Sequence, residues 1–190
     1  MIAFPKPEFS EPFMPDLSPE AMADLGFDQP YQSEAVKFQV RDGAQIHGQK
    51  YEHTSNKTIL LLHGTLGSSY TFNKTSGLLR EVLEANVIAI DLRGHGQSAG
   101  RPGDVSTPNQ YAEDLDDIIA SIRTENPDET ILLAGLSMGG GIVLRHAETF
   151  PNTQVDGYLL FAPNLGNSAP TTSRNLDLDN NFIKSHLSRG

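Results

Sequence analysis

Residues 131–141 read Ile-Leu-Leu-Ala-Gly-Leu-Ser-Met-Gly-Gly-Gly, a short apolar run that leads into a serine between glycines. The run has the length of a buried strand, and the residues from about Met138 to Thr149 have the spacing of a helix. A strand, a tight turn and a helix in this order project the hydroxyl of Ser137 from the sheet edge, and Gly135 and Gly139 let the backbones pass closely. The pattern predicts that Ser137 is a catalytic nucleophile with a strained backbone.

Taken alone, this five-residue pattern is weak. With 17 glycines in 190 residues, it arises by chance in roughly one such chain in ten, and the glycines would then only permit tight packing of strand on helix. The strand before Ser137 and the helix after it make the nucleophile interpretation the stronger one.

A second turn supports this interpretation. His63-Gly64-Thr65-Leu66-Gly67 follows directly on the apolar run at 59–62. An oxyanion hole requires N–H groups from two separate loops, and a glycine-rich turn after a neighbouring strand supplies one. We therefore expect the backbone N–H groups of Thr65 and Met138 to converge on the carbonyl oxygen of a substrate attacked by Ser137, with His63 and Gly64 supporting the turn.

The rest of the chain alternates strands and helices. Residues 1–34 are rich in Pro, Glu and Asp and predict an irregular arm, and residues 35–51 predict a hairpin that turns at Arg41-Asp42-Gly43. Thr107-Pro108 marks the start of a helix, with Pro at the first helical position. This alternation predicts an α/β fold, a mostly parallel sheet with helices on both faces. Further strands are expected at 58–62, 86–90, 131–134 and 157–162, and helices at about 69–83, 107–126 and 138–149.

A third motif, Asp91-Leu92-Arg93-Gly94-His95-Gly96-Gln97-Ser98, follows the strand at 86–90. With the turns at His63 and Ser137, it makes residues 36–163 resemble the α/β-hydrolase superfamily, in particular the branch of serine hydrolases similar to lysophospholipases and monoglyceride lipases. The resemblance implies a hydrolase core at about 35–163 and a small-molecule or lipid-like ester as substrate. It also implies that the third motif shapes a loop beside the site, with a structural His95 and with Arg93 tying loops together.

The sequence departs from that resemblance towards its end. The resembling enzymes carry their acid after the seventh strand and their catalytic His after the eighth, whereas this chain reaches only the sixth, at Gly157 to Ala162. We therefore expect a sheet truncated after about the sixth strand, with the catalytic acid and His absent from this chain and residues 164–190 forming the start of a cap or a disordered tail. His146, His186, Asp156, Asp177 and Asp179 receive no role. The open sheet edge predicts self-association.

The expected reaction is hydrolysis of carboxylic esters through an acyl-Ser137 intermediate, inactive or very weak in the truncated chain because Ser137 lacks a base. Two alternatives stay open. The chain is either a non-catalytic remnant of the fold, such as a binding module, or part of a peptidase or acyltransferase that uses the same turn.

Composition narrows the classes of partner. A net charge of −10 argues against nucleic acid, whose binders display clustered Lys and Arg. No apolar run approaches the roughly 20 residues needed to span a bilayer, so we expect no transmembrane segment. Without cysteine there is no disulfide or thiolate metal site, and we expect neither metal nor cofactor. The first residues lack the basic start and apolar centre of a signal peptide, which favours the cytoplasm.

Overall fold

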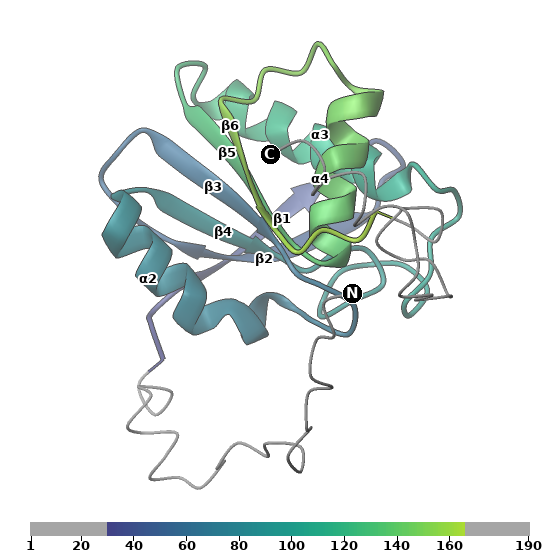
Figure 1. The fold of residues 1–190 in the computed structure, drawn as a ribbon, viewed down its shortest axis with the longest axis horizontal. Helices are drawn as coiled ribbons and strands as arrows, with labels where there is room; N and C mark the ends of the chain where they lie inside the picture. The colour runs from purple at the N-terminus through teal and green to yellow at the C-terminus, as the bar shows by residue number, and fades with distance from the viewer. Residues whose placement is uncertain (1–29, 166–190) are drawn as a thin grey trace, which may run out of the picture.

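A six-stranded sheet organises residues 30–165, the part of the chain that the computed structural model describes. Its strands lie in the order β1-β2-β4-β3-β5-β6, and helices cover both faces (Figure 1). This is the mostly parallel α/β sheet, with helices on both faces, that the sequence predicts. The strands are β1 (Glu34–Gln39), β2 (Gln45–Tyr51), β3 (Lys57–Leu62), β4 (Asn86–Ile90), β5 (Thr130–Leu136) and β6 (Gly157–Phe161).

Strand direction brings the predicted motifs to one edge of the sheet. β1 pairs with β2 and β2 with β4 in antiparallel fashion, which confirms the hairpin, whereas β3, β4, β5 and β6 are mutually parallel. Parallel strands place their carboxyl ends at the same edge. The turns that begin at His63, Asp91, Ser137 and Ala162 therefore lie along that edge in one row.

The helices divide between the two faces. The 3-10 turn η1 (Ser69–Phe72) and α2 (Asn73–Leu83) lie on one face, and α3 (Gln110–Glu125) and α4 (Met138–Thr149) lie on the other (Figure 1). The sequence predicts one helix over 69–83, and the structure divides it into these two consecutive pieces. The predicted bounds of α4 are confirmed at both ends.

The core is built from side chains that alternate along the strands. On β3, Ile59 and Leu61 face α2, while Leu60 and Leu62 face α3 and α4. All four are essentially inaccessible to solvent, and full burial of one such side chain stabilises the fold by about 1.5–3 kcal/mol. The four consecutive apolar residues that end β3 are thus buried on both faces of the sheet, as expected of a central parallel strand.

One helix boundary differs from the prediction. Pro108 is not the first residue of α3, which begins at Gln110 with Asn109 at its N-cap. The N–H of Gln110 donates to the carbonyl of Thr107 at 3.1 Å, so Pro108 occupies the second position of a tight turn, where its fixed φ is equally favourable. The predicted arm up to residue 29 and the predicted cap or tail from 166 onward lie outside the described residues.

β1 and β6 are the edges of the described sheet. β6 exposes Tyr158, Leu160 and Phe161, each between 37% and 47% accessible. Self-association through this edge remains a prediction. Among residues 30–165, none of the helices has both the length and the apolar character needed to cross a membrane.

Candidate active site

Ser137 sits in a strained turn between β5 and α4. Its φ of 51° and ψ of −113° lie outside the regions that L-amino acids ordinarily occupy. The prediction of a strained backbone is confirmed. Such a conformation persists only where the surrounding structure fixes it, and it is concentrated at functional sites.

Two glycines make this turn sterically feasible. A Cβ placed on Gly135 would lie 2.5 Å from the carbonyl of Gly139, and one placed on Gly139 would lie 2.4 Å from the carbonyl oxygen of Leu62. Both contacts are with backbone atoms, which cannot swing aside as a side chain can. The expected role of these glycines, to let strand and helix backbones pass closely, is therefore confirmed.

The turn after β3 meets the Ser137 turn. A Cβ on Gly64 would lie 3.2 Å from Ser137 Cβ and 3.9 Å from its Oγ, so the backbone of Gly64 runs directly beside the hydroxyl. Thr65 Oγ1 approaches Met138 Sδ to 3.9 Å, which brings the two residues predicted to form the oxyanion hole together. Within residues 30–165, no acceptor takes the backbone N–H of Thr65 or of Met138.

His63 holds the Gly64 peptide in place. Its ring is 1% exposed, and Nε2 accepts the N–H of Leu92 at 3.1 Å. The proton is therefore on Nδ1, which donates to the carbonyl of Gly64 at 2.7 Å. Burial lowers the pKa of His63 and favours this neutral form. His63 thus anchors the turn beside Ser137.

The loop after β4 is fixed by a network of its own. Asp91, 4% exposed, accepts the N–H groups of Ser69 and Gln97 at 2.6 and 2.9 Å. Arg93 forms a two-armed hydrogen bond with buried Asp114 on α3 and an ion pair with Asp42 in the hairpin turn. The structure thereby confirms that Arg93 ties loops together.

His95 and His146 do not hydrogen-bond Ser137. His95 Nδ1 donates to the carbonyl of Arg93 at 3.0 Å. His146, in the last turn of α4, places Nε2 3.5 Å from Asp116 Oδ1. Within residues 30–165, no histidine ring hydrogen-bonds the Ser137 hydroxyl, and Asp156 is held by Arg123 and the N–H of Ile131. The described residues also contain no cluster of His, Asp and Glu that could bind a metal.

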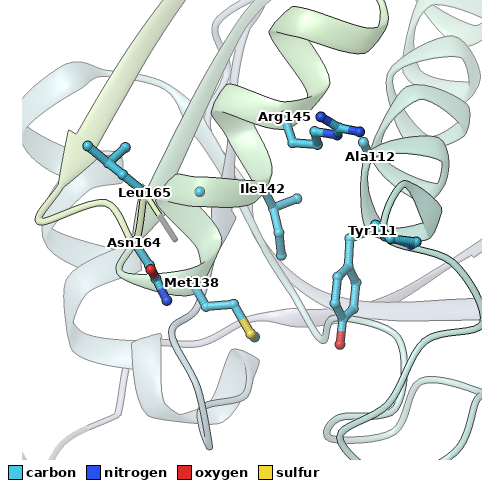
Figure 2. A pocket seen from close by; sticks show the side chains of 9 residues that line it. Tyr111, Ala112, Met138, Ile142, Arg145, Asn164 and Leu165 are labelled. Carbon is cyan, nitrogen blue, oxygen red and sulfur yellow. The ribbon is translucent and has the colours of Figure 1, made fainter. Parts of the chain in front are cut away.

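A pocket opens beside the first turn of α4. It has a volume of about 330 Å³, with Arg145 and Tyr111 on one side and Asn164 and Leu165 on the other (Figure 2). Met138, the residue after Ser137, and Asn164, whose backbone N–H donates to the carbonyl of Ser137, both border it. The pocket is therefore contiguous with the proposed oxyanion site.

Comparison with known proteins identifies the family. A family model described as serine aminopeptidase, S33, matches residues 53–186, which is more than half of the chain. The chain belongs to this family. It is thus a member of the α/β-hydrolase superfamily, as the three motifs predict.

Relatives of this S33 chain include hydrolases of several kinds. The uncharacterized hydrolase YugF of Bacillus subtilis is 30% identical over 106 residues, 56% of this chain and 37% of YugF. Monoacylglycerol lipase of Mycolicibacterium smegmatis is 32% identical over 65 residues, 34% of this chain and 23% of the lipase. The solved esterase EaEST of Exiguobacterium antarcticum superposes with a TM-score of 0.57 at 25% identity, covering 67% of this chain and 45% of that chain. The chain spans less than half the length of each.

Sequence reasoning missed one part of this S33 site. Asn164 follows β6, in a region without periodicity, yet its backbone N–H donates to the carbonyl of Ser137 at 2.8 Å. A signal was present in the sequence, because Gly140 and Gly141 extend the glycine run beyond what the motif requires. Extra glycines in a helix indicate close approach of another backbone.

Proposed function

We propose that this protein hydrolyses carboxylic esters through an acyl-enzyme intermediate on Ser137. The observation that carries the proposal is the meeting of two turns: the strained Ser137 lies against Gly64, and the N–H groups of Thr65 and Met138 have no other acceptor in residues 30–165. The names of the esterase and the monoacylglycerol lipase among its relatives support an ester as substrate.

In the proposed reaction, Ser137 Oγ attacks the ester carbonyl carbon while a base takes the hydroxyl proton. The carbonyl oxygen becomes an oxyanion, to which Thr65 and Met138 donate their N–H groups. When the carbon–oxygen bond of the ester breaks, the alcohol leaves with the proton. Water then attacks the acyl-Ser137 ester by the same route and releases the acid.

Within residues 30–165 no histidine hydrogen-bonds Ser137, which supports a base that lies outside the described residues. A serine hydroxyl without an adjacent base is a poor nucleophile at neutral pH. We therefore propose that the base and the acid that orients it come from outside the described residues, and that the 190-residue chain by itself is inactive or very weak.

The pocket beside α4 supports an apolar substrate. Tyr111, Met138, Ile142 and Leu165 offer it apolar surface, and such surface binds hydrocarbon by excluding water. We propose that it receives part of a small or lipid-like ester bound at Ser137.

A peptide bond is the second candidate for the scissile group, favoured by the description of the family as serine aminopeptidase. The lack of a base at Ser137 within residues 30–165 favours a third, non-catalytic candidate, in which the fold only binds a partner. Measured in a form of the chain extended to include the base, hydrolysis of a short-chain nitrophenyl ester compared with an aminoacyl nitroanilide separates the first two, and absence of both reactions in that form favours the third.

Labelling with a fluorophosphonate tests the nucleophile directly, because this probe reacts only with a serine that is activated by a base and faces an oxyanion hole. The 190-residue chain is expected to label very slowly. A form extended downstream of Gly190 to include the base is expected to label rapidly, and Ser137→Ala in that form to abolish labelling with an unchanged unfolding midpoint. Rapid labelling of the short chain would show that a base already reaches Ser137. Labelling that survives Ser137→Ala would remove Ser137 from the mechanism.

A further inference from the structure

The end of β6 and the segment Ala162–Asn164 directly after it contact the backbone of the proposed nucleophile at one point each. The N–H of Ser137 donates to the carbonyl of Phe161, the last residue of β6, at 2.9 Å. The carbonyl of Ser137 accepts two N–H groups, from Asn164 at 2.8 Å and from Gly141 at 3.1 Å. Both polar backbone groups of Ser137 are therefore fixed, and β6 with the residues after it supplies one partner to each.

These contacts determine the direction of one proposed oxyanion donor. The carbonyl of Ser137 and the N–H of Met138 belong to the same planar trans peptide, so they point in opposite directions. Because Asn164 and Gly141 hold the carbonyl, they also fix the direction of the N–H. The same relation applies at the other donor: His63 and the N–H of Gly67 hold the carbonyl of Gly64 at 2.7 and 3.0 Å, which fixes the N–H of Thr65.

The glycine run of α4 makes room for this segment. A Cβ on Gly141 would lie 2.4 Å from the carbonyl oxygen of Asn164, and one on Gly140 would lie 2.9 Å from Pro163 Cβ. Glycine is the poorest helix former apart from proline, so two additional glycines in the first turn of a helix need a reason. Close approach of residues 163–164 supplies it.

Ala162 adds a strained turn to the same segment. Its φ is 43°, a left-handed conformation that alanine rarely adopts. It lies directly between Phe161, which accepts from Ser137, and the residues that pack on α4. Strain of this kind persists where surrounding contacts fix the backbone, and the hydrogen bonds to Ser137 are such contacts.

We infer that residues Ala162–Asn164 are a positioning segment for the nucleophile, in which the backbone N–H of Asn164 sets the conformation of Ser137 and the direction of the Met138 N–H. The catalytic role of this segment rests on the proposed function, whereas its effect on the backbone conformation of Ser137 rests on the hydrogen bonds alone. Asn164 acts through the Ser137 peptide and is not itself a catalytic residue.

A pair of substitutions at one position isolates the N–H. Asn164→Pro removes the donor, because proline has no backbone N–H, whereas Asn164→Ala changes the side chain and keeps it. Crystal structures of both variants of the 190-residue chain give the readout. Ser137 is expected to keep its φ near 51° in Asn164→Ala and to leave this conformation in Asn164→Pro. An unchanged Ser137 and Met138 backbone in Asn164→Pro would overturn the inference.

Gly141→Ala provides the second variant, in case Asn164→Pro does not fold. Alanine is the better helix former, so α4 itself is expected to gain from the change, while the new Cβ displaces the carbonyl of Asn164. We expect the distance from Asn164 N to Ser137 O to lengthen beyond hydrogen-bonding range. A hydrogen bond of unchanged length in a well-folded Gly141→Ala variant would contradict the inference.

The effect of the segment on the reactivity of Ser137 is measured separately, as the rate of fluorophosphonate labelling of the form extended to include the base. Asn164→Pro and Gly141→Ala are each expected to slow labelling about 10- to 100-fold, as displaced oxyanion donors do. Asn164→Ala keeps the N–H and changes only a side chain that borders the pocket, so it is expected to label clearly faster than Asn164→Pro, and all three variants keep their fold by circular dichroism. A parent that does not label contradicts the proposed function and leaves the crystal structures to decide the positioning. A parent that labels, with Asn164→Pro equally fast, contradicts the positioning alone.

Discussion

At Ser137 the backbone adopts a conformation that a residue with a side chain avoids. Its φ of 51° and ψ of −113° bring Cβ close to backbone atoms, and glycine alone takes such angles without strain. The conformation is held because its N–H and carbonyl are both bonded to the segment at the end of β6. The strained backbone at Ser137 therefore lowers the stability of the fold, but it directs the hydroxyl towards Gly64.

Replacing Ser137 by glycine is therefore expected to give a more stable protein than replacing it by alanine. Both changes remove the hydroxyl, but only alanine retains the Cβ that causes the strain. We expect Ser137→Gly to exceed Ser137→Ala by about 1 kcal/mol in free energy of unfolding, measured by urea denaturation of the 190-residue chain.

Ser121 on α3 is the matched control for this comparison. It lies inside a regular helix, where glycine is less favourable than alanine by about 1 kcal/mol. The order of stability at Ser121 is thus expected to be the reverse of that at Ser137. Alanine more stable than glycine at both positions would show that the Ser137 turn is not strained in solution.

At the scale of the element, α4 begins against the backbone of β3. Gly139 is the closest point, since its hypothetical Cβ would lie 2.4 Å from the carbonyl oxygen of Leu62 and 2.7 Å from that of His63. Because both neighbours belong to the central strand of the sheet and the turn after it, they cannot move without disturbing the core. α4 can approach the backbone of β3 this closely only with glycine at position 139.

Gly139→Ala is expected to destabilise the fold despite the higher helix propensity of alanine. Overpacking in a close-packed interior costs about 1–3 kcal/mol, which exceeds the gain of about 1 kcal/mol from helix propensity. Urea denaturation followed by circular dichroism measures the change. Glu148→Ala, at the exposed end of the same helix, is the control and should stay within about 0.5 kcal/mol of the parent. A Gly139→Ala variant as stable as the control would contradict the close packing.

Pattern reasoning succeeded for elements whose residues alternate or repeat. The continuous apolar runs of β3 and β4 predict buried strands. The residues of α4 have the spacing of a helix, and this spacing predicts both ends of α4, because burial against a sheet requires apolar residues to recur at the period of the element. Pro108 was misplaced because proline favours the first turn of a helix and the second position of a tight turn alike. Asn164 was missed, since a backbone hydrogen bond leaves no mark on the type of its own side chain. The extra glycines at 140 and 141 indicate only that some backbone approaches α4 closely, and they do not identify which one.

At the scale of the whole molecule, a polar cluster joins the hairpin turn to the two helices of one face. Arg41, after β1, pairs with Asp116 and Asp117 of α3 at 2.9 and 2.7 Å. Asp116 also accepts the hydroxyl of Thr153 at 2.6 Å, and the buried ring of His146 on α4 lies 3.5 Å from it. His146 is therefore a titratable group enclosed where three elements meet.

This arrangement predicts that stability falls as the pH is lowered through the range in which histidine titrates. Burial lowers the pKa of His146 below its ordinary value of 6.5, and nearby Asp116 only partly opposes this. The unfolded chain consequently binds a proton at a pH where the folded chain does not. The stability is fully present above the unfolded pKa and is lost as the pH falls towards the folded pKa, at no more than about 1.4 kcal/mol per pH unit for one group.

His146→Leu tests this by removing the titration. Both ring nitrogens of His146 lack a good hydrogen-bond partner in the described residues, so an apolar side chain of similar size leaves no partner orphaned. The free energy of unfolding, measured in urea at intervals between about pH 7.5 and 5.5, should fall less steeply in the variant than in the parent. Burial lowers the pKa of His63 as well, but its contribution is common to both proteins and cancels in the difference between the curves. Curves that stay parallel over the whole range would show that His146 takes up its proton equally in the folded and unfolded chain, and would exclude it as a source of the pH dependence.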